Sequence, residues 1–169
     1  AWDYLMHLGY GARDIVVAGD SAGGNLALVL TMLLRDAGRL LPRRLVLMSP
    51  WTDMTASGKS YRERRDADPM ITMNYIQAVR AAYAPGRELS SPMLSPLFGD
   101  FDRFPPVLIQ VGTNEILMSD SVRLRDRLVQ AGIPCRLEVW PDMWHVFQMF
   151  PMKKASQAMD SVGRFLLET

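Results

Sequence analysis

The chain has 169 residues, of which 49% are hydrophobic and 22% are charged, a composition typical of a soluble globular domain. Because 19 basic and 18 acidic side chains leave a net charge of +1, we expect neither nucleic acid nor an anionic membrane as a partner. The sequence has no run of about 18 uncharged apolar residues, so no membrane span is expected. The single cysteine, Cys135, excludes an internal disulfide and is compatible with a cytoplasmic location, which we expect.

The first eight residues have the pattern of a short amphipathic helix that ends at Gly9. They contain neither an initiator methionine nor a signal peptide, so we expect a longer protein whose N-terminal portion precedes them. Residues 14–18 are rich in β-branched side chains and predict a buried strand. Good helix formers at about 22–37 predict a helix, with Gly38 at its C-terminal end.

Further strands and helices alternate along the rest of the chain. Buried strands are predicted at residues 44–48 and 107–111, and the alternating pattern of 135–140 predicts an edge strand. Helices are predicted at about 119–131 and 153–167. This order predicts an α/β fold with a parallel sheet, right-handed crossovers and helices on both faces. In such sheets, functional residues gather at the carboxyl ends of the strands.

The region from residue 57 to residue 90 has a different composition. A charged run at 62–66 precedes a helix expected near 73–83, and such a segment can lie over the sheet rather than in it. Residues 84–106 are rich in proline, glycine and serine and predict a long ordered loop. Because 169 residues is about the length of one domain, we expect residues 1–169 to form a single domain.

A G-x-S-x-G motif follows the first predicted strand directly, and its residues are Gly19, Asp20, Ser21, Ala22 and Gly23. Between a strand and a helix, this motif forms a sharp turn that exposes the serine hydroxyl. Glycines at positions 19 and 23 are expected to remove steric collisions in that turn. Ser21 is therefore the candidate nucleophile and the Ala22 N–H a candidate oxyanion donor. The alternative is a turn that merely joins a strand to a helix.

A serine hydroxyl needs a base to accept its proton, and histidine is the usual base near neutral pH. The chain has two histidines. His7 lies on the first predicted helix, where we expect a surface or packing role. His145 follows the last predicted strand, at the correct end of the sheet, and is the candidate base. Its alternative role is packing among neighbouring aromatic side chains.

The catalytic acid is expected between the serine and the histidine in the sequence. The loop after the third strand contains Glu115, four residues beyond the strand, and Asp120, at the start of a helix. We favour Glu115, because an acidic side chain at a helix N-terminus has a structural role of its own. Asp142, three residues before His145, is a third candidate. The acid would orient the imidazole and stabilise the imidazolium.

Four motifs in this order resemble the hormone-sensitive-lipase-like branch of the α/β-hydrolases, which includes many small bacterial esterases. They are the turn at residues 19–25, the strand end S-P-W-T-D at 49–53, the acid loop at 112–121 and the histidine loop at 142–145. Together they span essentially the whole chain. In the subgroup with this acid loop, the catalytic acid falls on the position of Glu115.

The resemblance implies that the chain is the C-terminal, catalytic part of an α/β-hydrolase fold, a mostly parallel sheet flanked by helices. Residues 57–90 would then form part of a helical lid. The family also carries a His-Gly-Gly-Gly motif that supplies further oxyanion donors, and these 169 residues do not contain it. Some relatives pair through the strand that corresponds to Arg136 to Trp140 here, so a homodimer is expected.

By the same resemblance, the expected reaction is hydrolysis of short- to medium-chain carboxylic esters through a Ser-His-Glu triad and an acyl-enzyme, with no metal or organic cofactor. Trp51 and Trp144 are candidate residues of the substrate pocket. One alternative is an inactive small-molecule-binding protein on the same fold, although such proteins lack the histidine that is present here as His145. A second is an amidase or acyltransferase with the same triad, and a third is that these residues alone are inactive.

Overall fold

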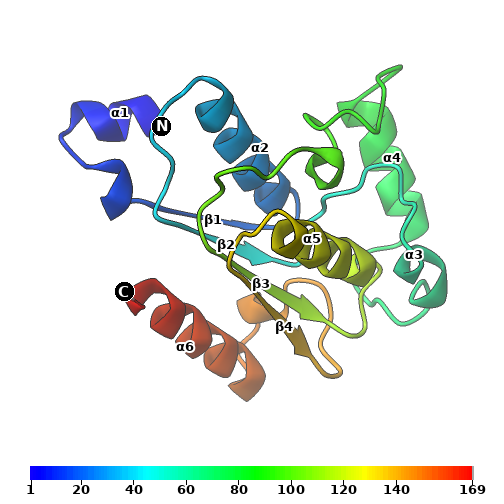
Figure 1. The fold of residues 1–169 in the computed structure, drawn as a ribbon. Coiled ribbons are helices and arrows are strands. Elements are labelled where there is room, and N and C mark those ends of the chain that lie inside the picture. Colours follow the sequence, from blue (N-terminus) through cyan, green and yellow to red (C-terminus); the bar gives the residue numbers. More distant parts are fainter. Residues whose placement is uncertain (169) are drawn as a thin grey trace.

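Four parallel strands form one sheet in the order β1-β2-β3-β4 in the computed structural model, which describes residues 1–168 (Figure 1). The strands are β1 (Val16–Asp20), β2 (Arg44–Met48), β3 (Val107–Gly112) and β4 (Cys135–Trp140). Each strand pairs in parallel with the next. The parallel sheet and the edge position of β4 are as predicted.

Helices cover both faces of this sheet, which confirms the α/β prediction. α2 (Ala22–Asp36) and α5 (Met118–Gln130) lie on one face, and α6 (Lys153–Leu167) lies on the other (Figure 1). α1 (Trp2–His7) lies beside α2, where Trp2 packs against Leu34. No helix in residues 1–168 combines the length and apolar character needed to cross a bilayer.

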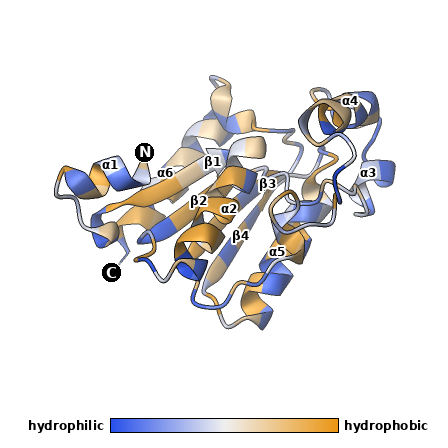
Figure 2. Cartoon of the chain, turned by 90° about the horizontal axis from the view of Figure 1, so that it is seen from above, coloured by the Kyte–Doolittle hydropathy of each residue, from blue (hydrophilic) through white to orange (hydrophobic). Residues whose placement is uncertain are grey.

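The central strands supply the core on both faces, because successive side chains of a strand point to opposite sides. On the side of α2 and α5, the buried strand residues are Leu45, Leu47, Val107 and Ile109. On the other side, Val46 and Leu108 pack against Val162 and Phe165 of α6. Figure 2 shows the hydrophobic colour concentrated along the strands and α2. This rigid core fixes the strand ends, from which the candidate site residues project.

Two further helices, α3 (Ser60–Glu63) and α4 (Met73–Tyr83), lie together beyond the carboxyl ends of the strands (Figure 1). A separate apolar cluster joins them to the loops after β2 and β3, and it contains Trp51, Tyr61, Ile71, Ile76, Ile116 and Leu117. The segment 57–90 therefore lies outside the sheet, as expected. Its role as part of a lid stays a prediction.

The observed elements differ from the sequence predictions in a few places. β1 begins two residues later than expected, because Ala12–Asp14 forms a 3₁₀ turn, and it extends to Asp20. α3 was not predicted, because a four-residue helix shows no periodicity. The loop from 84 to 106 contains a 3₁₀ turn at Pro96–Phe98.

Candidate active site

Ser21 occupies the sharp turn between β1 and α2. Its φ of 52° and ψ of −118° lie outside the regions that side chains favour. The turn is held by backbone hydrogen bonds, since Ser21 N donates to Met48 O (2.9 Å) and Trp51 N donates to Ser21 O (3.0 Å). Ala22 is the first residue of α2, where a backbone N–H has no acceptor within the helix. The turn therefore has the sharp strand-to-helix geometry expected of a G-x-S-x-G motif, and the role of Ser21 as nucleophile stays a prediction.

The glycines around Ser21 have unequal steric roles. A Cβ atom on Gly19 would lie 2.2 Å from the carbonyl carbon and oxygen of Gly23, so that position requires glycine. On Gly24, a Cβ would lie 2.7 Å from Pro50 Cβ. On Gly23, it would meet Asp20 Oδ1 at the ordinary distance of 3.8 Å. A side chain at position 23 would therefore collide with none of the described residues, so the expectation for Gly23 is wrong. The second position at which a side chain would collide is Gly24.

His145 and Glu115 form a buried pair at the carboxyl edge of the sheet. His145 Nδ1 lies 3.1 Å from Glu115 Oε2, and the two residues are 4% and 0% exposed. The loops that carry them are in close contact, because Asn114 N donates to Met143 O (2.9 Å). The structure thus brings together the candidate base and the favoured acid, which are 30 positions apart in the sequence.

The second oxygen of Glu115 is fully engaged by other donors. Glu115 Oε1 accepts hydrogen bonds from Gly112 N (2.5 Å) and from the Ser49 hydroxyl (2.9 Å). Ser49 Oγ in turn accepts from Val146 N (3.1 Å), next to His145. Because Oε1 has two donors, Oε2 is left to face the imidazole.

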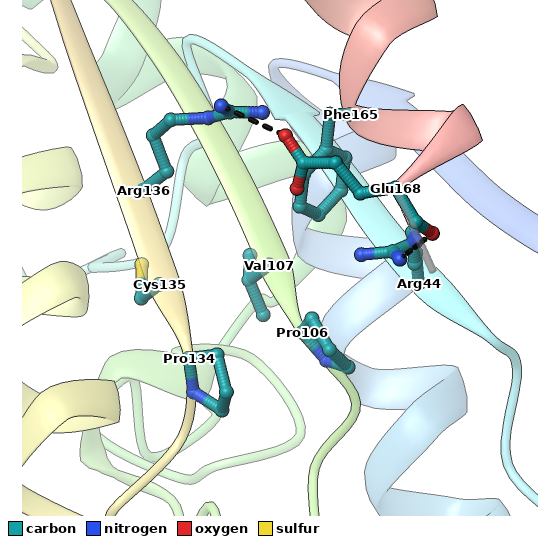
Figure 3. Close-up of a pocket in the computed structure, with 8 residues that line it drawn as sticks. All are labelled: Arg44, Pro106, Val107, Pro134, Cys135, Arg136, Phe165 and Glu168. Atoms are coloured by element: carbon teal, nitrogen blue, oxygen red, sulfur yellow. Dashed lines mark hydrogen bonds and ion pairs between the residues drawn. The ribbon is translucent and has the colours of Figure 1, made fainter.

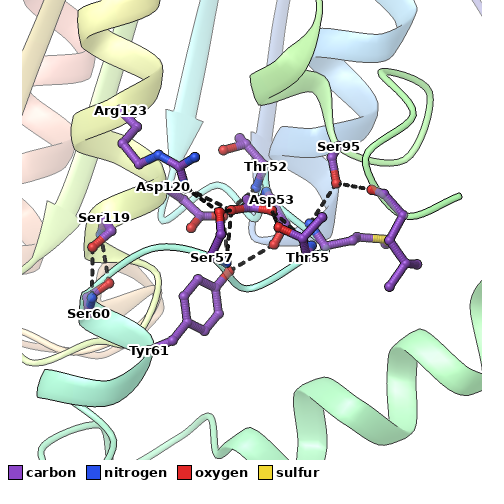
Figure 4. Close-up of polar contacts among 12 residues, drawn as sticks. Thr52, Asp53, Thr55, Ser57, Ser60, Tyr61, Ser95, Ser119, Asp120 and Arg123 are labelled. Carbon is purple, nitrogen blue, oxygen red and sulfur yellow. Dashed lines mark hydrogen bonds and ion pairs between the residues drawn. The ribbon is translucent and has the colours of Figure 1, made fainter.

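Asp120, the alternative acid, binds the loop after β2 through its carboxylate (Figure 4). Its Oδ2 accepts from Thr52 N and Asp53 N (both 2.9 Å) and from the Tyr61 hydroxyl (3.1 Å). Burial raises the pKa of Asp120 to about 8, and the nearby charge of Asp53 adds to this. Asp142, the other candidate acid, is exposed, and its Oδ2 lies 3.7 Å from Lys154 Nζ.

Asp53 is the charged centre of the same loop. Burial acts to raise its pKa, but hydrogen bonds from Ser57, Thr55 and Arg123 outweigh burial and lower the pKa below its ordinary value. Arg123 Nη1 lies 2.8 Å from Asp53 Oδ2 (Figure 4). Burial also raises the pKa of Tyr61 well above its usual range. This network fixes the backbone that follows Ser49.

Ser21 is connected to the acid-base pair through the segment 49–51. Among residues 1–168, no hydrogen bond joins the Ser21 hydroxyl to His145. Instead, Trp51 N donates a hydrogen bond to the Ser21 carbonyl oxygen. In the same segment, the Ser49 hydroxyl donates a hydrogen bond to Glu115 Oε1. Hydrogen bonds between catalytic groups are often long without substrate and tighten in the complex.

The remaining candidates have other surroundings. His7 is exposed on α1, as expected. Trp51 is 4% exposed and packs in the apolar cluster with α3 and α4, while Trp144 stacks edge-on with Phe150 at 5.5 Å. Their place in a substrate pocket stays a prediction. In the described part of the chain, no three His, Cys, Asp or Glu side chains gather into a group that could hold a metal ion.

A surface pocket lies at the opposite edge of the sheet, beside the first residues of β2, β3 and β4 (Figure 3). Arg136 Nη1 lies 3.1 Å from Glu168 Oε1 there, and Arg44 donates to the Glu168 carbonyl. Cys135 also lines it, and burial raises the pKa of this thiol to about 12. None of the candidate catalytic residues lines this pocket.

A family model described as alpha/beta hydrolase fold matches residues 2–149. The chain belongs to the α/β-hydrolase family. Within it, relatives named as an esterase and a carboxylesterase, and a solved esterase of the bacterial hormone-sensitive lipase family, match this α/β-hydrolase along nearly its whole length. This agrees with the resemblance of the four motifs.

Among the relatives, an esterase from Acinetobacter venetianus is 37% identical over 164 residues, covering 95% of this chain and 54% of that protein. An acetyl-hydrolase from Streptomyces hygroscopicus is 34% identical and covers 98% and 56%. The chain thus spans little more than half the length of these relatives.

Solved structures match the chain at a similar sequence identity and coverage. The crystal structure of an esterase from the bacterial hormone-sensitive lipase family is 38% identical with a TM-score of 0.96, covering 98% of this chain and 57% of that one. Crystals of EstE5 soaked with p-nitrophenyl butyrate gave a structure that is 36% identical with a TM-score of 0.92, covering 98% and 56%.

Two residues near the candidate site of this α/β-hydrolase were not singled out by the sequence. The sequence marks Ser49 as no more than a member of the strand-end motif, yet its hydroxyl donates a hydrogen bond to Glu115 Oε1. Asp68, in the segment 57–90, accepts through Oδ2 from Ile116 N (3.0 Å), one residue after Glu115. Neither has a sequence signal of its own, because each contact joins residues more than 45 positions apart.

Proposed function

We propose that the protein is a serine carboxylesterase with Ser21 as nucleophile, His145 as general base and Glu115 as the orienting acid. The observation that carries this proposal is the buried contact of 3.1 Å between His145 Nδ1 and Glu115 Oε2. It lies at the same edge of the sheet as the strained turn of Ser21. A nucleophile, a base and a third group that orients the base are the constellation that acyl transfer requires.

The reaction follows from these positions. His145 Nε2 takes the proton of the Ser21 hydroxyl as Oγ attacks the ester carbonyl, and the Ala22 N–H stabilises the oxyanion at the start of α2. His145 then protonates the departing alcohol, which leaves an acyl-enzyme. Water, activated by the same imidazole, attacks that ester and releases the acid and Ser21. Glu115 holds the proton on Nδ1 throughout and stabilises the imidazolium.

We propose short- to medium-chain carboxylic esters as substrates. The names of two relatives, esterase and acetyl-hydrolase, support this class, as does the soak of EstE5 with a butyrate ester. The segment 57–90 lies beyond the strand ends and is suited to cover such a substrate.

We also propose that two copies associate through β4, between Arg136 and Trp140. In the described sheet β4 is an outer strand, so one side of its backbone lacks a strand partner, and Val139 on it is 39% exposed. Light scattering of the full-length protein is expected to give the mass of a dimer. A monomer at all concentrations would contradict this.

The function is tested by hydrolysis of p-nitrophenyl esters from acetate to decanoate by the full-length protein and by its Ser21→Ala variant. Turnover that peaks at short chains and is lost in the variant is expected. Labelling by a fluorophosphonate, which reacts with activated serines, should be lost in the same variant. A folded protein with neither turnover nor labelling would favour the small-molecule-binding alternative, and a higher rate on amides than on esters would favour an amidase.

A further inference from the structure

We infer that Ser49 is a positioning residue that fixes the Glu115 carboxylate against His145 and couples both to the loop that holds Ser21. This inference rests on the proposed esterase function. Ser49 is the first residue after β2 and is 0% exposed. Its backbone N–H donates to Gln110 O of β3 (2.7 Å), so the residue is anchored to the rigid centre of the sheet.

The direction of the Ser49 hydroxyl follows from its two partners. Val146 N is a donor, so Ser49 Oγ must accept in that contact of 3.1 Å. A hydroxyl has one proton, and the other contact is with Glu115 Oε1 at 2.9 Å. The proton of Ser49 therefore points at the carboxylate, in a hydrogen bond to a charged acceptor, which is stronger than a neutral one.

This hydrogen bond determines which carboxylate oxygen faces the imidazole. Gly112 N and Ser49 Oγ both donate to Oε1, so rotation of the carboxylate away from this position would break two hydrogen bonds at once. Oε2 then faces His145 Nδ1 at 3.1 Å. Because the site is buried, water cannot easily replace a lost donor, and an unpaired buried group costs more than the bond itself contributes.

The same residue joins the three loops of the candidate site. Through Val146 it fixes the backbone that follows His145, and Val146 itself has a φ of 50°. Two residues after Ser49, Trp51 N donates to the carbonyl of Ser21. A displacement of Ser49 would therefore change the position of the acid, the base and the nucleophile relative to one another.

The backbone of Ser49 also points to a role for its side chain. Its φ of 47° lies in the left-handed region, which glycine adopts without steric cost. A serine in this conformation costs free energy that the surrounding structure must offset. A glycine at this position would avoid that cost but would lack the hydroxyl. The hydroxyl is the group that donates to Glu115 Oε1 and accepts from Val146 N.

The test uses Ser49→Ala and Ser49→Gly in the full-length protein. Glycine relieves the positive φ, so it keeps the experiment informative if the alanine variant does not fold. Ser121→Ala is the matched control, since Ser121 is also fully buried but its hydroxyl has no hydrogen-bond partner in the described part of the chain. Each Ser49 variant should lower kcat about tenfold or more with KM within about twofold.

A second measurement does not depend on turnover. The proton on His145 Nδ1 should give a separate downfield resonance in the NMR spectrum, and loss of the Ser49 donor should shift or broaden it, while Ser121→Ala should leave it unchanged. Folded Ser49 variants with wild-type kcat, or with a lower kcat but an unaltered resonance, would overturn the inference. Absence of wild-type turnover would instead refute the esterase proposal, and the resonance would still report on Ser49.

Discussion

Asp68 Oδ2 accepts a hydrogen bond from the backbone N–H of Ile116 at 3.0 Å, directly after Glu115. Its other oxygen, Oδ1, accepts from Met70 N and Ile71 N within its own segment. One buried carboxylate therefore joins the segment beyond the strand ends to the acid loop. A reciprocal pair of bonds between Ser60 and Ser119 lies nearby, each backbone N–H donating to the other hydroxyl at 2.8 Å (Figure 4).

Replacement of Asp68 should therefore lower the stability of the protein. Asp68→Asn replaces one carboxylate oxygen with an NH₂ group, which cannot accept a hydrogen bond. Whichever way the amide is oriented, this NH₂ group faces a backbone N–H that the carboxylate had bound, so at least one buried N–H loses its acceptor. We expect the free energy of unfolding to fall by about 1–3 kcal/mol, measured by urea denaturation. The exposed Asp66→Asn is the control and should show no change. Equal stability of both variants would mean that this contact does not hold the loop.

Glu115→Gln should lower kcat by about 10³–10⁴-fold, because the amide cannot stabilise the imidazolium and disturbs the orientation of the ring. Steady-state kinetics on p-nitrophenyl acetate measure this. Asp142→Asn distinguishes the alternative acid, and we expect its kcat within about twofold of wild type, since Asp142 is exposed and lies beside Lys154. A large loss in Asp142→Asn with an active Glu115→Gln would reverse the assignment.

The raised pKa of Asp120 predicts a pH dependence of stability. Its carboxyl titrates near 8 in the folded protein, mainly because of burial, against an ordinary value of 3.8. The folded state therefore binds this proton more tightly than the unfolded state does. The contribution of Asp120 to stability should be greatest below about pH 4 and should decline as the pH rises towards 8.

Urea midpoints at pH 5 and pH 8 measure that decline. In Asp120→Asn, which cannot titrate, the difference between the two midpoints should be smaller than in wild type. The amide oxygen can still accept from Thr52 N and Asp53 N, so the variant is expected to fold. An identical difference in both proteins would show that Asp120 keeps its charge throughout this range.

The two glycines of the G-x-S-x-G motif should respond differently to alanine. Gly19→Ala places a Cβ 2.2 Å from the Gly23 backbone, which cannot move without distorting the turn, so we expect a loss of about 3 kcal/mol. Gly23→Ala meets just one ordinary contact of 3.8 Å and lies within α2, so its stability should change by less than about 1 kcal/mol. Thermal unfolding of both variants measures the contrast, and equal losses would contradict it.

The sequence by itself determined the regular elements and the order of the candidate catalytic residues. The predicted bounds of β2, β4, α4 and α6 agree with the structure, because in these elements the apolar pattern is regular enough to indicate both type and extent. Since the carboxyl ends of parallel strands meet at one edge, the order of strands and loops also placed Ser21, Glu115 and His145 at that edge.

The tertiary structure alone decided which groups contact one another there. Ser49 lies 66 positions from Glu115 and 97 from Val146, and nothing local marks its hydroxyl as their link. Likewise, the buried role of Asp120 and the need for glycine at position 24 depend on the loop after β2, which folds against both. Periodicity reports how a segment is buried, but hydrogen bonds and close contacts between distant segments are set by how the packed sheet brings its loops together.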